Sequence, residues 1–237
     1  MDYLSIVYQN LFMNQSYTGG IAAFFGGYDG VGLLSNFFGE KSVLIIDIDP
    51  EVLEWWEKIS EEQGFDITLI KYDAREPIDD SIKVDITKFD IDAWRTDPPY
   101  NCAGMFCFLS RIFYLNEKKV PVYLTVPTGH CWSDLLKHNV WKFIIDSGKK
   151  ITGVSPSLFN YTHYEGPDSF AWKIEGDSYN MLIDNDKFVS DIYGPSILFA
   201  NSALGCKQYD VCKSQRNEWD KVIESRRTSV KRNDDIK

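Results

Sequence analysis

One stretch of sequence decides the fold: residues 19–50, GGIAAFFGGYDGVGLLSNFFGEKSVLIIDIDP. The apolar run 19–25 predicts a short strand, which leads into the turn Gly26-Gly27-Tyr28-Asp29-Gly30. Glycines between a strand and a helix let the backbone turn tightly and approach a ligand closely. After a helix-like run at 31–38, the continuous apolar run 43–46 is typical of a parallel strand buried on both faces. This order of elements predicts a nucleotide-binding unit, although the glycines lack the dinucleotide-type spacing.

Two aspartates follow the second strand, and their positions separate their roles. Asp47 comes about twenty residues after the glycines, the spacing expected of an acid that binds a ribose diol. Asp49 directly precedes Pro50, and proline suits the first position of a helix. We therefore predict that Asp49 caps a helix over 50–63 and that Asp47, with Gly27, binds the nucleoside of a cofactor.

The alternation continues along the chain. Further strands are predicted at 67–70, 89–96, 122–126 and 150–154, with helices at 105–115 and 132–147. This rhythm predicts an α/β fold with a mostly parallel sheet and helices on both faces. The strand-like runs 169–174 and 196–203 are expected to complete the sheet with antiparallel strands. Ligands of such sheets bind at the carboxyl ends of the strands, where four predicted site residues fall: Gly27, Asp47, Asp73 and Asp97.

The corner Asp97-Pro98-Pro99-Tyr100 is the most informative motif for chemistry. Each proline fixes φ near −65° and lacks a backbone N–H, so the corner holds its carboxylate rigidly at the strand end. Such corners occur in enzymes that transfer a group from a sulfonium donor to an amino nitrogen. Asp73 lies one strand earlier, and two interpretations stay open for it: a contact to the adenine amino group, or a solvated turn acid beside Arg75.

Four motifs together resemble one family, the branched-chain polyamine synthases, also called N4-bis(aminopropyl)spermidine synthases. They are the glycine turn, the Asp-Ile-Asp strand end at 47–49, Tyr72-Asp73-Ala74-Arg75-Glu76-Pro77, and the corner with its preceding Thr96. The segment Phe108-Leu109-Ser110-Arg111 is similar to the family's next helix, and the resemblance covers roughly residues 20–165.

The resemblance implies a Rossmann-like, class I S-adenosylmethionine-dependent transferase fold. The implied reaction moves an aminopropyl group from decarboxylated S-adenosylmethionine to a polyamine nitrogen, without a metal. The chain departs from the family in two ways. Of the three carboxylates in the family's Gly-Asp-Asp-Asp loop, only Asp29 is present here. About twenty residues precede the first strand, so the family's N-terminal domain is expected to be missing. A different acceptor, or intact S-adenosylmethionine as donor, is consistent with these departures.

The resemblance assigns roles to further residues. Asp97 and Asp29 would accept or orient the proton of the attacking amine, which must be unprotonated to react. Tyr100 would cover the acceptor, through shielding or a cation–π contact, and Pro98 would line the donor. Acceptor contacts are expected from Tyr28, Tyr161, Tyr164 and Glu165. The structural alternatives are a packing role for Tyr100, a helix cap for Asp29, and a polar surface loop around 161–168.

Bulk composition agrees with a small cationic substrate. The 237 residues carry a formal net charge of −10, which attracts a polyamine and repels a polyanion such as nucleic acid. The five cysteines form no Cys-x-x-Cys pair and the three histidines lie apart, which argues against disulfides and a zinc site. Neither a signal peptide nor an apolar run of ~18 residues is visible, so a cytoplasmic protein without membrane contact is expected, by default a homodimer.

We expect three regions: an N-terminal extension at 1–18, the catalytic domain at 19–212, and a charged helix and tail at 213–237. Two alternative functions stay open beside aminopropyl transfer. One is an S-adenosylmethionine-dependent methyltransferase or aminocarboxypropyltransferase acting on an amino group of a small molecule, and less readily of a nucleic-acid base. The other is a non-catalytic binding protein of the same fold.

Overall fold

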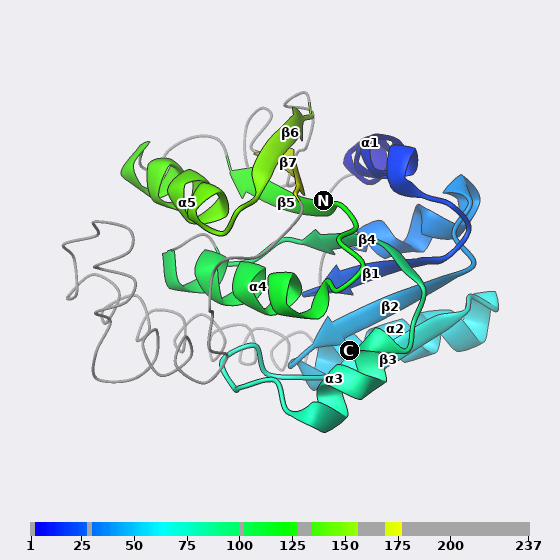
Figure 1. Cartoon of the computed structure of the whole chain (residues 1–237). Helices are drawn as coiled ribbons and strands as arrows, with labels where there is room; N and C mark the ends of the chain where they lie inside the picture. The colour runs from blue at the N-terminus through cyan, green and yellow to red at the C-terminus, as the bar shows by residue number, and fades with distance from the viewer. Residues whose placement is uncertain (1–2, 28–29, 100–101, 128–133, 156–168, 177–237) are drawn as a thin grey trace, which may run out of the picture.

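A seven-stranded sheet forms the centre of the protein (Figure 1). The structure is a computed structural model, and it describes residues 3–27, 30–99, 102–127, 134–155 and 169–176. The strands are β1 (Ile21–Phe25), β2 (Ser42–Asp47), β3 (Ile67–Lys71), β4 (Ile91–Thr96), β5 (Val122–Pro127), β6 (Lys150–Val154) and β7 (Ser169–Glu175). The α-helices are α1 (Tyr3–Met13), α2 (Pro50–Gln63), α3 (Asp80–Thr87), α4 (Cys102–Leu115) and α5 (Asp134–Asp146), and the 3₁₀ helices are η1 (Asn14–Ser16) and η2 (Val31–Phe38).

The strand order is β3-β2-β1-β4-β5-β7-β6. The neighbouring strands from β3 to β5 pair in parallel, whereas β7 runs antiparallel to both β5 and β6. The chain leaves β1 toward β2 and β3 and later returns to the other side of β1 with β4. The predicted α/β fold, mostly parallel with antiparallel strands near its end, is therefore confirmed. The predicted strand at 196–203 lies outside the described residues.

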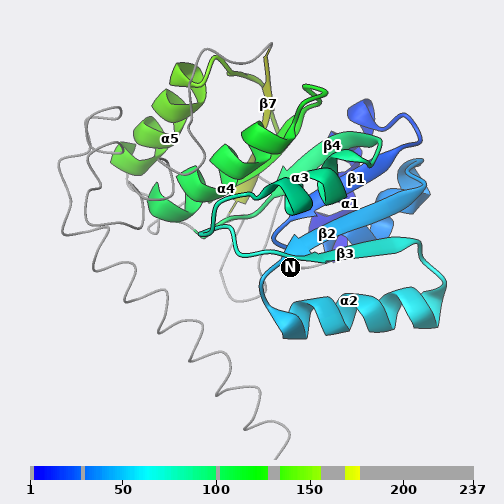
Figure 2. The same cartoon turned by 60° about the horizontal axis from the view of Figure 1, so that its bottom comes forward.

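Helices cover both faces of the sheet, and each face has its own apolar core (Figures 1 and 2). Successive side chains of a strand point to opposite faces, so Ala23 and Phe25 of β1 enter one core while Ala22 and Phe24 enter the other. The first core includes side chains from α3, α4 and α5, and the second includes side chains from α1, η2 and α2. The continuous apolar runs of β1 and β2 follow from burial on both sides.

Helix α2 begins where the sequence predicts. The Asp49 side chain accepts a hydrogen bond from the Glu51 N–H at 3.0 Å, and Pro50 occupies the first turn, so the predicted cap and bounds are confirmed. The run 31–38 is helical too, but as a 3₁₀ helix. A Cβ on Gly32 would lie only 3.1–3.3 Å from Trp56, Val43 and Phe24, so this segment lies very close to the sheet and α2.

Helix α1 lies within the segment expected as an N-terminal extension. Met13 is buried in the second core, and the buried Gln9 side chain accepts a hydrogen bond from Arg95 Nε of β4 at 2.7 Å. This helix therefore packs on the sheet of the same domain. In the described part of the chain, no helix is both long and apolar enough to cross a bilayer.

Candidate active site

The first two residues of the glycine turn, Gly26 and Gly27, are held by contacts to β2 and α2. Gly26 has φ +84°, a conformation that favours glycine, and its N–H donates to the Ile46 carbonyl at 2.8 Å. The Gly27 carbonyl accepts a hydrogen bond from Trp56 Nε1 at 2.8 Å. A Cβ on Gly27 would lie 2.5 Å from Ile45 Cγ2 and 2.9 Å from Trp56 Nε1, so no larger residue fits here without rearrangement. Gly26 and Gly27 thus have little conformational freedom.

Asp47 links the glycine turn to the end of β2. One carboxylate oxygen accepts the Gly27 N–H at 2.9 Å, and the other accepts the Asp49 N–H at 2.9 Å. Burial raises the pKa of Asp47, and these two backbone hydrogen bonds oppose that effect. The structure therefore brings together two residues that the sequence predicts for donor binding. Because each carboxylate oxygen has two lone pairs, the fixed carboxylate keeps acceptor capacity toward a ribose diol.

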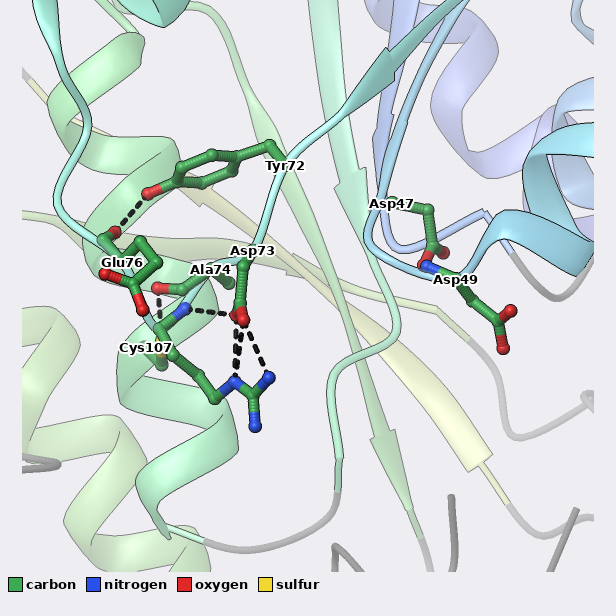
Figure 3. Close-up of polar contacts among 8 residues, drawn as sticks. Asp47, Asp49, Tyr72, Asp73, Ala74, Glu76 and Cys107 are labelled. Atoms are coloured by element: carbon green, nitrogen blue, oxygen red, sulfur yellow. Dashed lines mark hydrogen bonds and ion pairs between the residues drawn. The ribbon is translucent and has the colours of Figure 1, made fainter. Parts of the chain in front are cut away.

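Asp73 lies in the loop after β3, and its carboxylate is turned onto Arg75 (Figure 3). The Arg75 N–H and Nε donate to one carboxylate oxygen at 2.9 Å each, and Nη2 donates to the other at 2.7 Å. This geometry matches the turn acid beside Arg75, one of the two interpretations that the sequence left open. The Asp73 side chain is 22% exposed, so part of its acceptor surface is accessible. The adenine contact stays a prediction.

The proline corner continues β4, next to the glycine turn. Thr96 is paired in register with Phe25, and Thr96 Oγ1 donates to the Phe25 carbonyl at 2.8 Å. Asp97 is partly buried and Pro98 is buried. Helix α4 starts close behind them, because a Cβ on Gly104 would lie 2.7 Å from the Pro99 carbonyl oxygen. The strand ends therefore place Asp97 beside the turn that contains Gly27.

Several predicted site residues lie outside the described part of the chain: Tyr28, Asp29, Tyr100, Tyr161, Tyr164 and Glu165. Their assigned roles stay predictions. Tyr28 and Asp29 stand between the described residues Gly27 and Gly30, and Tyr100 directly follows Pro99. Among the described residues, no group of three or more His, Cys, Asp or Glu side chains is arranged to hold a metal ion.

The structure gives contacts near the site to residues for which the sequence predicted no role. Trp56 supports the glycine turn, and Cys107 and Arg111 of α4 contact the loop that carries Asp73. The position of Trp56 in an amphipathic helix marks it as a core residue, and nothing in the sequence marks its hydrogen bond. For Arg111 a signal exists, since it is a charged residue at the end of the otherwise uncharged run 101–110.

These features define a class of protein. A doubly wound sheet with an antiparallel β7, a glycine turn after β1 and an acid at the end of β2 form a Rossmann-like fold of the S-adenosylmethionine-dependent transferase type. The chain matches the family of the branched-chain polyamine synthase A C-terminal domain over residues 24–200 and belongs to it.

One curated protein is similar in sequence, and solved structures share the fold. An uncharacterized protein of Methanocaldococcus jannaschii is 28% identical over 190 residues, which cover 78% of this chain and 46% of the relative. A branched-chain polyamine synthase mutein from Thermus thermophilus, in complex with N4-aminopropylspermidine and 5′-methylthioadenosine, has TM-score 0.63 and 19% identity, covering 76% of this chain and 57% of its own. A mutant of MtNAS in complex with S-adenosylmethionine has TM-score 0.51 and 17% identity, covering 73% and 61%. The chain thus spans about half the length of the curated relative it matches.

Proposed function

We propose that this protein transfers an aminopropyl group from decarboxylated S-adenosylmethionine to an amine nitrogen of a polyamine-like acceptor. One observation carries the proposal: the Gly27–Asp47 hydrogen bond and Asp97 lie at neighbouring strand ends in a member of the branched-chain polyamine synthase family. Gly27 and Asp47 provide a subsite for the nucleoside of the donor, and the Asp97 carboxylate provides a site for an amine at the same edge of the sheet.

The donor is proposed to lie over the ends of β1, β2 and β3. Asp47 accepts hydrogen bonds from the ribose diol, while the glycine turn leaves room for the backbone to approach the sulfonium side of the donor. Asp73, one strand further along, is the proposed acceptor for the adenine amino group. Pro98, buried at the end of β4, limits the pocket on the side of the reacting carbon.

The acceptor is proposed to meet Asp97. The lone pair of the amine nitrogen attacks the propyl carbon next to sulfur, so an N–C bond forms as the C–S bond breaks. The electrons of the broken bond go to sulfur, which leaves as the neutral thioether 5′-methylthioadenosine, and the proton of the nitrogen passes to Asp97 and then to solvent. The sulfonium is already a good leaving group, so the protein contributes mainly positioning and proton acceptance.

Charge supports a cationic acceptor. The net charge of −10 favours the approach of a polyamine over that of an anionic substrate. Asp29, Tyr28, Tyr100, Tyr161, Tyr164 and Glu165 are proposed to complete the acceptor pocket.

A second candidate keeps the same donor site but uses intact S-adenosylmethionine, for methyl or aminocarboxypropyl transfer to an amino group. It is favoured by the glycine turn, where Asp29 is the single carboxylate in the stretch from Gly26 to Gly30. Intact donor carries a carboxylate of its own, and fewer acidic neighbours repel it less.

Calorimetric titration with both donors distinguishes the candidates, followed by mass spectrometry of polyamine mixtures. We expect tighter binding of the decarboxylated donor and a mass increase of one aminopropyl group.

The Asp97→Asn variant is expected to lose at least about 10²-fold in turnover while donor affinity changes less than about twofold, since a positioned base contributes 10²–10⁴-fold. Asp66→Asn, an exposed residue before β3 at the opposite end of the sheet, is the matched control. Preference for the intact donor, or full turnover by Asp97→Asn, would contradict the proposal.

A further inference from the structure

Helix α4 holds the loop after β3 at the Ala74 carbonyl group. Cys107 Sγ donates to the Ala74 carbonyl at 2.8 Å (Figure 3), and Arg111 Nε donates to the same oxygen at 3.1 Å. Cys107 and Arg111 are four residues apart, so they lie on one face of α4. Both are buried, with 1% exposure each. Two buried donors from one helix thus converge on one backbone acceptor.

The burial of Arg111 argues for a positional role. Placing a guanidinium in a protein interior carries a large desolvation cost, and an apolar residue of similar size is often at least as good for stability. Here the guanidinium contributes a directed hydrogen bond that an apolar side chain lacks. This bond fixes the position of the Ala74 carbonyl, and Ala74 directly follows Asp73 in the chain.

The loop itself is otherwise closed by local hydrogen bonds. Asp73 accepts from Arg75, the Glu76 N–H donates to the Asp73 carbonyl at 2.9 Å, and the Tyr72 hydroxyl donates to the Glu76 carbonyl. Burial raises the pKa of Tyr72, so its hydroxyl stays a neutral donor at physiological pH. These bonds give the loop a shape, and the Tyr72 N–H, which donates to the Asp47 carbonyl at 3.0 Å, joins the start of the loop to the end of β2. The contacts to Ala74 give that shape a fixed place relative to the sheet.

The same helix also contacts the glycine turn. The Phe108 ring packs edge-on against Phe25 with 5.1 Å between ring centroids, and a Cβ on Gly26 would lie 3.1 Å from Phe108 Cε1. Adjacent positions on α4 therefore touch the turn after β1 and the loop after β3. These are the two elements proposed to hold the donor at its sulfonium and adenine ends. The Phe-Leu-Ser-Arg segment at 108–111, to which the sequence assigns no role, provides one contact to each.

We propose that Cys107 and Arg111 are positioning residues for adenine recognition, which act by holding Ala74 so that Asp73 meets the exocyclic amino group of the donor. This inference rests on the proposed function, because it assumes that an adenosyl donor binds over the loop. Neither side chain touches the donor. Their removal should therefore reduce discrimination between adenine and a base without the amino group, as well as affinity.

The test uses the full-length protein and two nucleosides, 5′-methylthioadenosine and 5′-methylthioinosine, which carries an oxo group in place of the amino group. Calorimetry on the wild type is expected to show at least a tenfold higher affinity for the adenine compound, which corresponds to about the free energy of one hydrogen bond. In Arg111→Met this preference is expected to fall to about twofold or less. In Arg111→Lys, which keeps a donor, it should be partly restored.

Two further variants separate positioning from general damage to the helix. Cys107→Ser keeps a donor toward Ala74 and should retain the preference, whereas Cys107→Ala should lower it. Ser110→Ala is the matched control, because Ser110 is equally buried in α4 and its hydroxyl donates to the Cys107 carbonyl of the same helix. It is expected to keep the wild-type preference. If Arg111→Met fails to fold, the two Cys107 variants carry the test.

The outcomes distinguish this inference from the proposed function. Binding of the wild type with a base preference that no Cys107 or Arg111 variant changes would overturn the positioning role and leave the proposed function standing. A wild type that binds neither nucleoside would overturn the proposed donor site and the positioning role with it. Loss of preference in Arg111→Met and Cys107→Ala, with retention in Cys107→Ser and Ser110→Ala, supports the inference.

Discussion

At the scale of single residues, Asp47 is the side chain on which donor binding is expected to depend most. Both of its oxygens accept backbone N–H groups, so an amide at this position would direct its NH₂ group at an N–H donor. We predict that Asp47→Asn weakens donor binding by about 1.5–3 kcal/mol, the range for hydrogen bonds to a charged group. Calorimetric titration with 5′-methylthioadenosine measures the change.

The neighbouring Asp49 provides the matched control for that substitution. Its side chain caps α2 through the Glu51 N–H, while its own N–H donates to Asp47. Asp49→Ala is therefore expected to cost about 1 kcal/mol of unfolding free energy, as caps generally do, and to leave donor affinity nearly unchanged. Equal donor affinity in wild type and Asp47→Asn would remove Asp47 from the site.

At the scale of elements, the start of α4 is fitted to the proline corner. An ordinary Gly→Ala substitution inside a helix stabilises it by about 1 kcal/mol. Gly104→Ala is predicted to behave differently, because the added methyl group would lie 2.7 Å from the Pro99 carbonyl oxygen and would displace the corner that carries Asp97. A displacement of about 1 Å can cost 10²-fold in rate, so turnover is expected to fall by at least tenfold with donor affinity retained.

Thermal unfolding and turnover of Gly104→Ala are measured together, with Ser110→Ala as a control in the same helix. A higher unfolding temperature with unchanged turnover would show that the corner tolerates the methyl group, contrary to this prediction.

Elements also show how far the sequence predicts the structure. The strands and α2 were predictable because their signals are local: a continuous apolar run, or Asp before Pro at a helix start. The presence of Gly27 and Asp47 at one edge of the sheet was predictable as well, since parallel strands end at one edge, but their hydrogen bond was not predicted. The contacts of Trp56 with Gly27 and of Cys107 with Ala74 join residues 29 and 33 positions apart, and no local pattern encodes them. For Asp73, the sequence could not show whether its carboxylate pairs with Arg75, because that depends on the orientation of the Arg75 side chain.

At the scale of the whole molecule, the candidate site and a pair of carboxyl groups, the buried Glu40 and the partly buried Asp92, lie at opposite ends of the sheet. Glu40 precedes β2 and Asp92 lies near the start of β4, whereas the glycine turn and Asp97 follow the strand ends. Burial works to raise the pKa of Asp92, but hydrogen bonds from Gly20 and Thr18 outweigh it and hold the pKa below its usual value. Burial and the charge of Asp92 raise the pKa of Glu40 to about 7. In slightly acidic solution Glu40 is therefore protonated, while Asp92 is ionised.

The raised pKa of Glu40 predicts a pH dependence of stability. The folded state holds the Glu40 proton up to a pKa of about 7, while the unfolded chain releases it near 4.5. Between these values the folded state binds more protons, so the free energy of unfolding falls as pH rises, by about 1–3 kcal/mol in total. The nearby Tyr17 hydroxyl stays neutral throughout, because burial raises its pKa.

Glu40→Gln should remove this fall of the unfolding free energy with pH and leave donor affinity unchanged. Glu61→Gln, a substitution of an exposed residue of α2, should keep it. Urea unfolding at pH 5, 6, 7 and 8 measures it, and equal slopes in wild type and Glu40→Gln would contradict the prediction.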